Sequence, residues 1–223
     1  MKREIITTAD GSTTIHLPEW DEQYHSKHGA IQEAYHVFIE MGLFYYLKNV
    51  SSTPLKILEI GFGTGLNAFI TQFEAAKINT TIDYTGVEAY PVEVSEIEKL
   101  NYSAQLNASE EVFKRIHKEA WESHSKISDS FFLTKRKQFF SEIEDKNVFH
   151  IIYFDAFGAR VQPELWTEAI FQKMYNALTE NGVLVTYSAK GSVRRAMQAV
   201  GFTVERLPGP PGKREMLRAL KSE

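Results

Sequence analysis

The sequence contains no cysteine among its 223 residues. This absence excludes disulfide bonds and any metal site built on cysteine, and it fits a reducing compartment. The sequence also lacks an apolar run of the roughly 18 to 20 residues that a membrane-spanning helix needs. The N-terminal segment Met1-Lys-Arg-Glu-Ile-Ile has neither the apolar core nor the small-residue cleavage site of a signal peptide. We therefore expect a soluble, cytoplasmic protein without a membrane partner.

A net charge of −4 argues weakly against nucleic acid as a partner, but the charge is unevenly distributed. Residues 190–223 contain eight basic and three acidic residues, a net charge of +5, so the rest of the chain carries −9. A basic end on an acidic body can bind a polyanion locally. A solvated C-terminal surface is the alternative interpretation of the same pattern.

The first 50 residues do not join the alternation of strands and helices that follows. Residues 5–8 and 13–16 flank an Asp10-Gly11 turn, which is typical of a β-hairpin. Apolar residues at helical spacing predict a helix over residues 29–47. We expect residues 1–50 to form an extension that covers one end of a main domain, which comprises residues 51–223.

Strands and helices alternate from Pro54 onward. Strands are predicted at residues 55–60, 82–88, 131–134, 148–154 and 183–187, and residues 202–205 and 215–220 read as an antiparallel pair. Helices are predicted from 66 to about 76, after Pro91, after Ser109, from Pro163 to near Asn181-Gly182, and after Gly191. This order predicts an α/β fold with a doubly wound, mostly parallel sheet and a ligand at the carboxyl ends of its strands.

The most informative motif, Glu59-Ile-Gly-Phe-Gly-Thr-Gly65, follows the first of these strands. Glycine at positions 61, 63 and 65 lets the backbone approach a ligand closely and adopt positive φ. The spacing differs from the G-x-G-x-x-G of dinucleotide-binding proteins, in which a pyrophosphate lies at the helix N-terminus. Alternating glycines suit a nucleoside without phosphates, such as S-adenosylmethionine (SAM). An ordinary glycine-rich turn is the alternative, and an NAD oxidoreductase is less favoured.

Acidic residues end three of the predicted strands. Glu59 closes the first strand, and Glu88 closes the second, where an acid can bind ribose hydroxyls. Asp155 follows the apolar strand 148–154 and could accept hydrogen bonds from an attacking amine and take up its proton. Each acid could instead be a solvated or structural side chain.

Cations and aromatic rings gather in the C-terminal third of the chain. Lys213 and Arg214 follow the loop Pro208-Gly-Pro-Pro-Gly212, and with Arg194 and Arg195 they could contact phosphates. Phe157 and Trp166 flank the loop of Asp155 and could stack on a base, although core packing is at least as favoured for Trp166.

Two other kinds of site find little support. His16, His25 and His28 lie near one another in sequence, but no carboxylate spacing supports a metal site, so we expect none. Ser188 and Ser192 lack a His/Asp partner pattern, so nucleophilic catalysis is not indicated.

These residues together resemble a class I SAM-dependent methyltransferase, and more narrowly the methyltransferase domain of the bifunctional tRNA-modifying MnmC family. The segments that carry the resemblance are Asp21-Glu-Gln-Tyr-His25, Ile60-Gly-Phe-Gly-Thr-Gly-Leu-Asn67, Phe154-Asp-Ala-Phe157, Pro163-Glu-Leu-Trp166, Val193-Arg-Arg195 and Gly212-Lys-Arg-Glu-Met216. They span nearly the whole chain in the family's order. The resemblance implies a seven-stranded Rossmann-like methyltransferase sheet, with a C-terminal antiparallel hairpin, over residues 51–223.

The resemblance also implies an activity, N-methylation of the aminomethyl group of 5-aminomethyl-2-thiouridine at the tRNA wobble position. It implies SAM as the cofactor and the tRNA anticodon region as the partner. A separate FAD-dependent oxidase, or the upstream enzymes that form the aminomethyl group, would supply the substrate. Implied cofactor residues are Glu59, Gly61, Gly63, Gly65, Asn67 and Glu88, with Asp155 as the catalytic residue.

One departure from the family concerns adenine recognition. The family usually has an acid just after the third strand, whereas this sequence reads Thr134-Lys-Arg-Lys-Gln138. The residues that meet adenine are therefore not assigned. Alternatives that share the fold are a methyltransferase for a small-molecule amine or a protein, an aminopropyltransferase, and a non-catalytic RNA-binding module.

Overall fold

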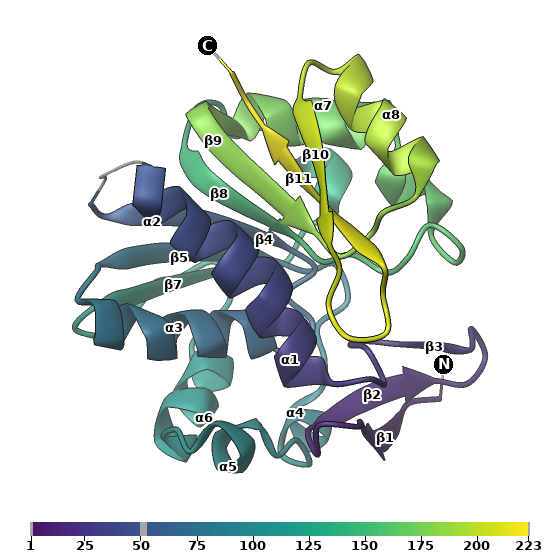
Figure 1. Cartoon of the computed structure of the whole chain (residues 1–223). Coiled ribbons are helices and arrows are strands. Elements are labelled where there is room, and N and C mark those ends of the chain that lie inside the picture. The colour runs from purple at the N-terminus through teal and green to yellow at the C-terminus, as the bar shows by residue number, and fades with distance from the viewer. Residues whose placement is uncertain (1, 50–52, 223) are drawn as a thin grey trace.

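The computed structural model describes residues 2–49 and 53–222, and within them a large sheet and a small sheet are flanked by helices (Figure 1). The strands of the large sheet are β4 (Leu55–Ile60), β5 (Ile82–Val87), β6 (His124–Ser128), β7 (Phe131–Arg136), β8 (Phe149–Phe154), β9 (Leu178–Thr186), β10 (Thr203–Pro208) and β11 (Glu215–Leu220). Their order across the sheet is β10-β11-β9-β8-β4-β5-β7-β6.

The middle of the large sheet is parallel. Strands β9, β8, β4, β5 and β7 run in one direction, while β10 with β11 and β6 add antiparallel edges. The apolar runs of β4, β5 and β8 arise because helices cover both faces of these strands. Strand β4 pairs with β5 on one side and β8 on the other, so the chain reverses its direction across the sheet at β4. In such sheets a ligand binds beside the carboxyl ends of the strands at this point.

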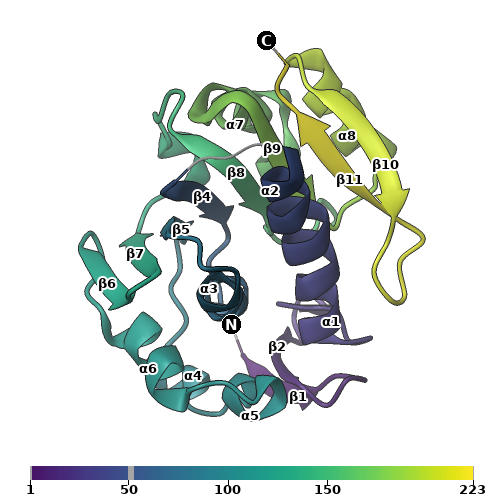
Figure 2. The same cartoon turned by 60° about the vertical axis from the view of Figure 1, so that its left-hand side comes forward.

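Helices form a layer on each face of the large sheet (Figures 1 and 2). The helices are α1 (Ala30–Ala34), which continues through a π-helical segment (Tyr35–Phe44) into α2 (Tyr45–Asn49), then α3 (Leu66–Ile78), α4 (Val94–Ile97), α5 (Tyr102–Leu106), α6 (Glu110–Lys118), α7 (Glu168–Ala177) and α8 (Gly191–Ala199), with 3₁₀ turns at Phe140–Glu142 and Pro163–Trp166. The long N-terminal helix and α3 pack on one face, and α7 and α8 pack on the other. Successive residues of a strand point to opposite faces of the sheet, so they pack in two different hydrophobic cores. Ile57 belongs to the same core as Phe69, and Leu58 belongs to the same core as Phe171.

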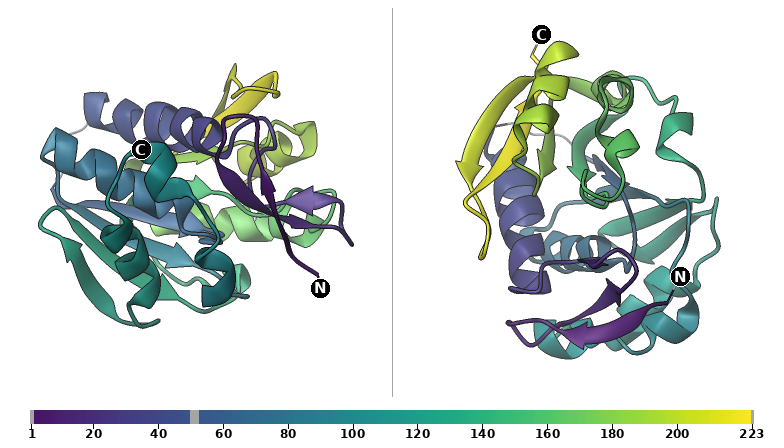
Figure 3. Two further views of the ribbon diagram at one scale, coloured as in Figure 1. Left: turned by 90° about the horizontal axis from the view of Figure 1, so that it is seen from below. Right: turned by 90° about the vertical axis from the view of Figure 1, so that its right-hand side faces the viewer.

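The N-terminal residues form a separate antiparallel sheet of β1 (Glu4–Thr7), β2 (Thr13–Leu17) and β3 (Glu22–Gln23), seen apart from the large sheet in Figure 3. Two links hold it against the segment that carries α4 and α5. Arg3 forms an ion pair with Glu96 at 2.7 Å. The Asn101 side chain accepts from the Thr13 amide at 2.8 Å and donates to the Gly11 carbonyl at 2.9 Å.

The predicted fold class, hairpin and order of elements are confirmed, with two differences in detail. The helix predicted from Pro163 to Asn181-Gly182 is wrong: a 3₁₀ turn precedes α7, α7 ends at Ala177, and the chain then enters β9. Asn181 has a φ of 60° and lies where the pairing of β9 with β8 shifts register, so Asn-Gly marks a bulge in a strand and not a helix end. Strand β6 was not predicted, and with it the described part of the large sheet has eight strands, not seven. The division predicted at residue 50 falls on residues 50–52, which lie outside the described residues.

Candidate functional site

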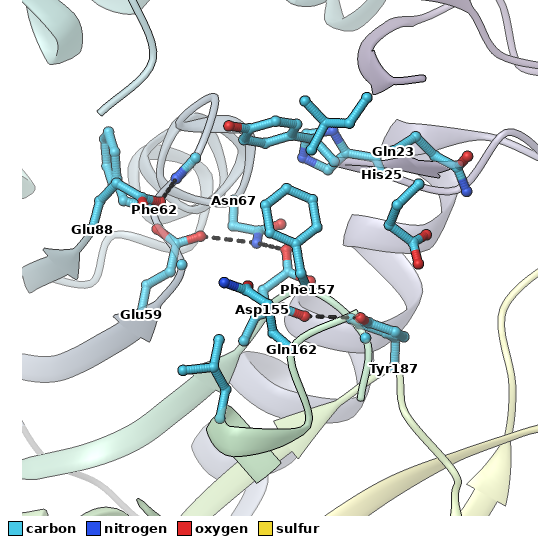
Figure 4. A pocket seen from close by; sticks show the side chains of 18 of the residues that line it. Gln23, His25, Glu59, Phe62, Asn67, Glu88, Asp155, Phe157, Gln162 and Tyr187 are labelled. Carbon is cyan, nitrogen blue, oxygen red and sulfur yellow. Dashed lines mark hydrogen bonds between the residues drawn. The ribbon is translucent and has the colours of Figure 1, made fainter. Parts of the chain in front are cut away.

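A cavity of about 1060 Å³ lies at the carboxyl ends of β4, β5 and β8. Its lining includes Glu59 from β4, Glu88 after β5 and Asp155 after β8, so the three predicted acids meet at one site (Figure 4). Trp20, residues 22–28 and Lys213 also line it. The cavity is large enough for a nucleoside together with a second ligand.

The turn after β4 requires glycine at two positions that line this cavity. Gly61 has a φ of 90°, and a Cβ there would lie 2.6 Å from the carbonyl oxygen of Asp155. Gly63 has a φ of 49°, and a Cβ there would lie 3.0 Å from the ring of Tyr24. Side chains are thus excluded both by backbone conformation and by space, which leaves a bare cradle for a ligand. Gly65 starts α3 and is not part of the lining; its missing Cβ makes room for His117.

Glu88 holds this turn through two backbone hydrogen bonds. Its carboxylate accepts from the Gly63 amide at 3.1 Å and from the Tyr90 amide at 3.0 Å. Each carboxylate oxygen has further acceptor capacity, and the side chain lines the cavity. Glu88 is therefore placed to accept from hydroxyl groups of a ligand in the cradle.

Asn67 joins two of the acids. Its side-chain amide donates to Glu59 at 2.9 Å and to Asp155 at 2.8 Å (Figure 4). Glu59 is 1% exposed and thus anchors this bridge from beneath. The amide oxygen of Asn67 is buried and accepts no hydrogen bond from the part of the chain that the structure describes.

The electrostatics of the site centre on Asp155. Burial raises the pKa of its carboxyl to about 7, and the charge of Glu33 acts in the same direction, against the Asn67 hydrogen bond and Lys213. Burial and the charge of Asp155 also raise the pKa of Glu59 well above its usual range. A carboxyl that titrates near neutrality in a cavity is suited to exchange a proton with a ligand.

The predicted cations separate into two groups. Lys213 lines the cavity, forms an ion pair with Glu33, and lies over the ring of Tyr187, with its Nζ 3.8 Å from the ring centroid. Arg195 and Arg214 are exposed and Arg194 is half-buried, and none of these three belongs to the cavity lining. The structure thus brings one of the four predicted cations to the site.

Of the two aromatic residues predicted to stack on a base, only Phe157 lines the cavity. Trp166 is 5% exposed, packs against Phe154 and Tyr187, and donates its indole N–H to the Phe157 carbonyl at 2.7 Å. The prediction for Trp166 is corrected accordingly: the residue supports the loop of Phe157 from the core.

Sequence reasoning missed the residues that the N-terminal segment contributes. Trp20, Tyr24, His25 and Glu33 all line the cavity. The segment Asp21–His25 carried the resemblance to a known family, and this signal could have identified Tyr24 and His25. At the other end of the cavity the exposed rings of Tyr90 and Phe139 contact each other edge to face at 6.0 Å.

The structure also shows which residues follow the third predicted strand, where the family usually has an acid. Arg136 at the end of β7 pairs with Asp145 at 2.7 Å, and the cavity wall beyond it is formed by Phe139, Phe140 and Ser141. Within the described residues no cluster of three or more His, Asp or Glu side chains could hold a metal ion. The described helices include none long and apolar enough to cross a membrane.

The fold and the site define an α/β protein that binds a nucleoside in a glycine-rich cradle at the reversal point of a parallel sheet. The sequence profile of a family described as S-adenosyl-L-methionine-dependent methyltransferases matches residues 94–222, and the chain belongs to this family. SAM is therefore its cofactor, and the chain is a methyltransferase.

The names of curated relatives are more specific than the description of the family. The tRNA 5-methylaminomethyl-2-thiouridine biosynthesis bifunctional protein MnmC of Leptospira borgpetersenii is 29% identical over 211 residues, which cover 89% of this chain and 32% of that protein. The MnmC protein of Marinomonas sp. is 26% identical over 218 residues, which cover 90% of this chain and 31% of that protein. The chain thus spans about a third of the length of these relatives.

Solved structures agree with this relationship. The crystal structure of MnmC2 from Aquifex aeolicus matches with a TM-score of 0.82 and 25% identity, over 100% of this chain and 71% of that one. Spermidine synthase from Thermotoga maritima matches with a TM-score of 0.60 and 16% identity, over 99% of this chain and 68% of that one, and shares the fold.

Proposed function

We propose that this chain methylates the primary amine of 5-aminomethyl-2-thiouridine at the tRNA wobble position, giving 5-methylaminomethyl-2-thiouridine. The observation that carries the proposal is the placement of Asp155, whose carboxyl is held by Asn67 and opens into the same cavity as the glycine turn. The relatives named for tRNA 5-methylaminomethyl-2-thiouridine biosynthesis support the choice of acceptor.

The residues of the cradle fit SAM. Glu88 retains acceptor capacity for the ribose hydroxyls, and Gly61 and Gly63 leave the backbone bare. Glu59 supports Asn67 from within the core, and Gly65 supports the start of α3. When bound, SAM supplies an electrophilic methyl group on a sulfonium that is already a good leaving group.

The remaining chemistry concerns the proton of the amine. An ammonium has no lone pair, so the acceptor must be neutral when it reacts. The Asp155 carboxylate accepts a hydrogen bond from the amine, orients it and takes up its proton, and Asn67 holds that carboxylate in place. Since the pKa of Asp155 lies near 7, the carboxyl can release the proton to solvent after each turnover.

The tRNA must present its wobble base unstacked to the cavity. Phe157 is the predicted ring for that base, and Arg194, Arg195 and Arg214 remain candidates for phosphate contacts outside the cavity. Lys213 already forms an ion pair with Glu33, so we expect it to form part of the cavity wall and not to contact a phosphate. Binding that rests on phosphate contacts would weaken steeply with salt.

The proposed reaction places two requirements on the cell. Another enzyme must supply the aminomethyl group, either upstream enzymes that form it or an FAD-dependent oxidase that removes a carboxymethyl group. The reaction also has to occur where tRNA is modified, which we take to be the cytoplasm.

The test is transfer of label from SAM to two tRNA pools, one with 5-aminomethyl-2-thiouridine at the wobble position and one without it, followed by nucleoside analysis. We expect label in the first pool alone, as the methylaminomethyl nucleoside. Decarboxylated SAM with a polyamine acceptor serves as a control for aminopropyl transfer. Label in neither pool, with SAM still bound, would overturn the choice of acceptor and leave the family intact.

A further inference from the structure

Three aromatic rings from two distant segments of the chain meet in the cavity. Phe157 contacts Tyr24 with ring centroids 4.9 Å apart and Trp20 with centroids 5.8 Å apart. The interplanar angles are 79° and 87°, so Tyr24 and Trp20 each stand nearly perpendicular to Phe157 and do not stack on it. All three rings line the cavity. We call Trp20, Tyr24 and Phe157 the aromatic walls.

Phe157 marks the acceptor side of the aromatic walls, and Tyr24 extends from Phe157 toward Gly63 of the glycine turn. In Figure 4, Glu88 and Phe62 lie at one end of the view, Gln23 and Tyr187 at the other, and Asn67 and Asp155 between them. The glycine turn and Glu88 mark the cofactor end, so a ligand at the aromatic walls meets Asp155 from the opposite side. Phe157 follows Asp155 by two residues, which ties the position of its ring to the catalytic carboxylate.

Arg160 joins the two segments that carry the aromatic walls. Its Nη2 donates to the carbonyl oxygens of Trp20 and Asp21, at 2.9 Å and 2.8 Å, and to the Glu22 carboxylate at 3.2 Å. These bonds span about 140 residues of sequence and connect the turn between β2 and β3 with the loop after β8. The Arg160 side chain is 56% exposed, so its removal should loosen this connection without opening the core.

We propose that Trp20, Tyr24 and Phe157 form the pocket for the acceptor base, and that Arg160 is a positioning residue that holds the two sides of this pocket together. The occupant is a flipped-out pyrimidine whose short amine arm points to Asp155, an assignment that rests on the proposed function. A planar ring can stack on one wall while its edge meets another, and proteins commonly recognise unstacked RNA bases in this way. Because Tyr24 also faces Gly63 of the glycine turn, Trp20 is the ring to replace in a test of this pocket.

The test compares paired variants in the intact protein, with wild type measured first on tRNA that carries 5-aminomethyl-2-thiouridine. Trp20→Leu removes the ring, and Trp20→Phe keeps a smaller one. Arg160→Ala removes the connection, and Arg160→Lys keeps the charge without the planar group. Arg115→Ala, at a comparably exposed arginine on α6 that lies outside the cavity lining and outside the basic segment 190–223, is the matched control.

We expect kcat/KM for tRNA to fall by about tenfold or more in Trp20→Leu and Arg160→Ala. Trp20→Phe should recover most of it, and Arg115→Ala should match wild type. The affinity for SAM, measured by calorimetry, should stay within about twofold in every variant. Far-UV circular dichroism and the melting temperature establish that each variant is folded.

Two results would overturn the inference, and they differ from a failure of the proposed function. Wild-type kinetics in folded Trp20→Leu and Arg160→Ala would remove the pocket but leave the reaction in place. A loss of SAM affinity equal to the loss of kcat/KM would move the rings to the cofactor site. A wild-type protein that binds SAM but does not methylate this tRNA would overturn the proposed acceptor, and the pocket assignment with it.

Discussion

The Glu33 carboxylate forms an ion pair with the Lys213 ammonium group, 180 residues further along the chain. Glu33 lies on α1, and Lys213 lies on the loop between β10 and β11. The pair therefore joins an N-terminal and a C-terminal segment of the chain in the cavity that Asp155 also lines. The second oxygen of Glu33 accepts from the Ser26 amide at 2.9 Å, which fixes the carboxylate in the cavity wall. The pair adds one negative and one positive charge to the surroundings of Asp155.

Replacing Asp155 by asparagine should separate catalysis from cofactor binding. Asparagine keeps the size of the side chain and an acceptor for Asn67, but it cannot take up a proton. We expect the single-turnover rate of methyl transfer to fall by about 100-fold or more, with SAM affinity within about threefold of wild type. Asp83→Asn, at an acid that meets His124 outside the cavity lining, is the control. An equal loss of SAM affinity would place Asp155 in the cofactor site instead.

Glu88→Ala should show the opposite pattern. The substitution removes the acceptor for the ribose and also frees the amides of Gly63 and Tyr90 from their partner. We expect SAM affinity, measured by calorimetry, to fall by about tenfold or more. Glu88→Gln keeps one side-chain acceptor and should lose less. Unchanged affinity in Glu88→Ala would refute the ribose assignment.

The charges around Asp155 should set the pH dependence of the reaction. Asp155 acts as a base only when ionised and has a pKa of about 7, so kcat/KM should rise with pH through about 7 and then level off. Lys213→Met removes the positive charge that favours ionisation, so the midpoint should move to higher pH. Glu33→Gln removes a negative charge that disfavours ionisation, so the midpoint should move to lower pH.

Each of these two variants removes one partner of the same ion pair, so the comparison separates an electrostatic role of the pair from a purely structural one. A purely structural pair would lower the rate in both variants without displacing the midpoints in opposite directions. The charges that face Asp155 from neighbouring elements also include Glu59, which stays in place in both variants. Titration of the substrate amine should appear in all pH profiles alike.

The raised pKa of Asp155 should also cost stability at neutral pH. The folded protein binds this proton with a pKa of about 7, against an ordinary value of 3.8 for an aspartate, so the group destabilises the fold progressively as pH rises from about 4 to 7. Asp155→Asn should therefore raise the free energy of unfolding by about 2–4 kcal/mol at pH 8, and this gain should vanish toward pH 4. Urea unfolding of both proteins across this range is the measurement. A gain independent of pH would show that ionisation is not its cause.

Most of the fold of this protein could be predicted from local sequence patterns. An apolar run, an acid and alternating glycines lie within a dozen residues, so the strand, the turn at Gly61 and the start of α3 follow from short-range chemistry. The proximity of Glu88 and Asp155 could be predicted from the sequence, because the carboxyl ends of parallel strands lie at one edge of the sheet. The bulge at Asn181 and the edge strand β6 were missed because their short polar segments acquire a strand conformation through pairing with neighbours.

The sequence by itself determined the cofactor end of the site, where spacing along the chain dictates which groups meet. The tertiary structure decided which residues form the acceptor end, where Trp20, Phe157 and Lys213 line one cavity from distant parts of the chain. It also decided that Trp166 is a support in the core and that Asn67 bridges two acids. The physical reason is that burial, pKa and side-chain pairing depend on groups far apart in sequence, whose proximity exists only once the chain has packed.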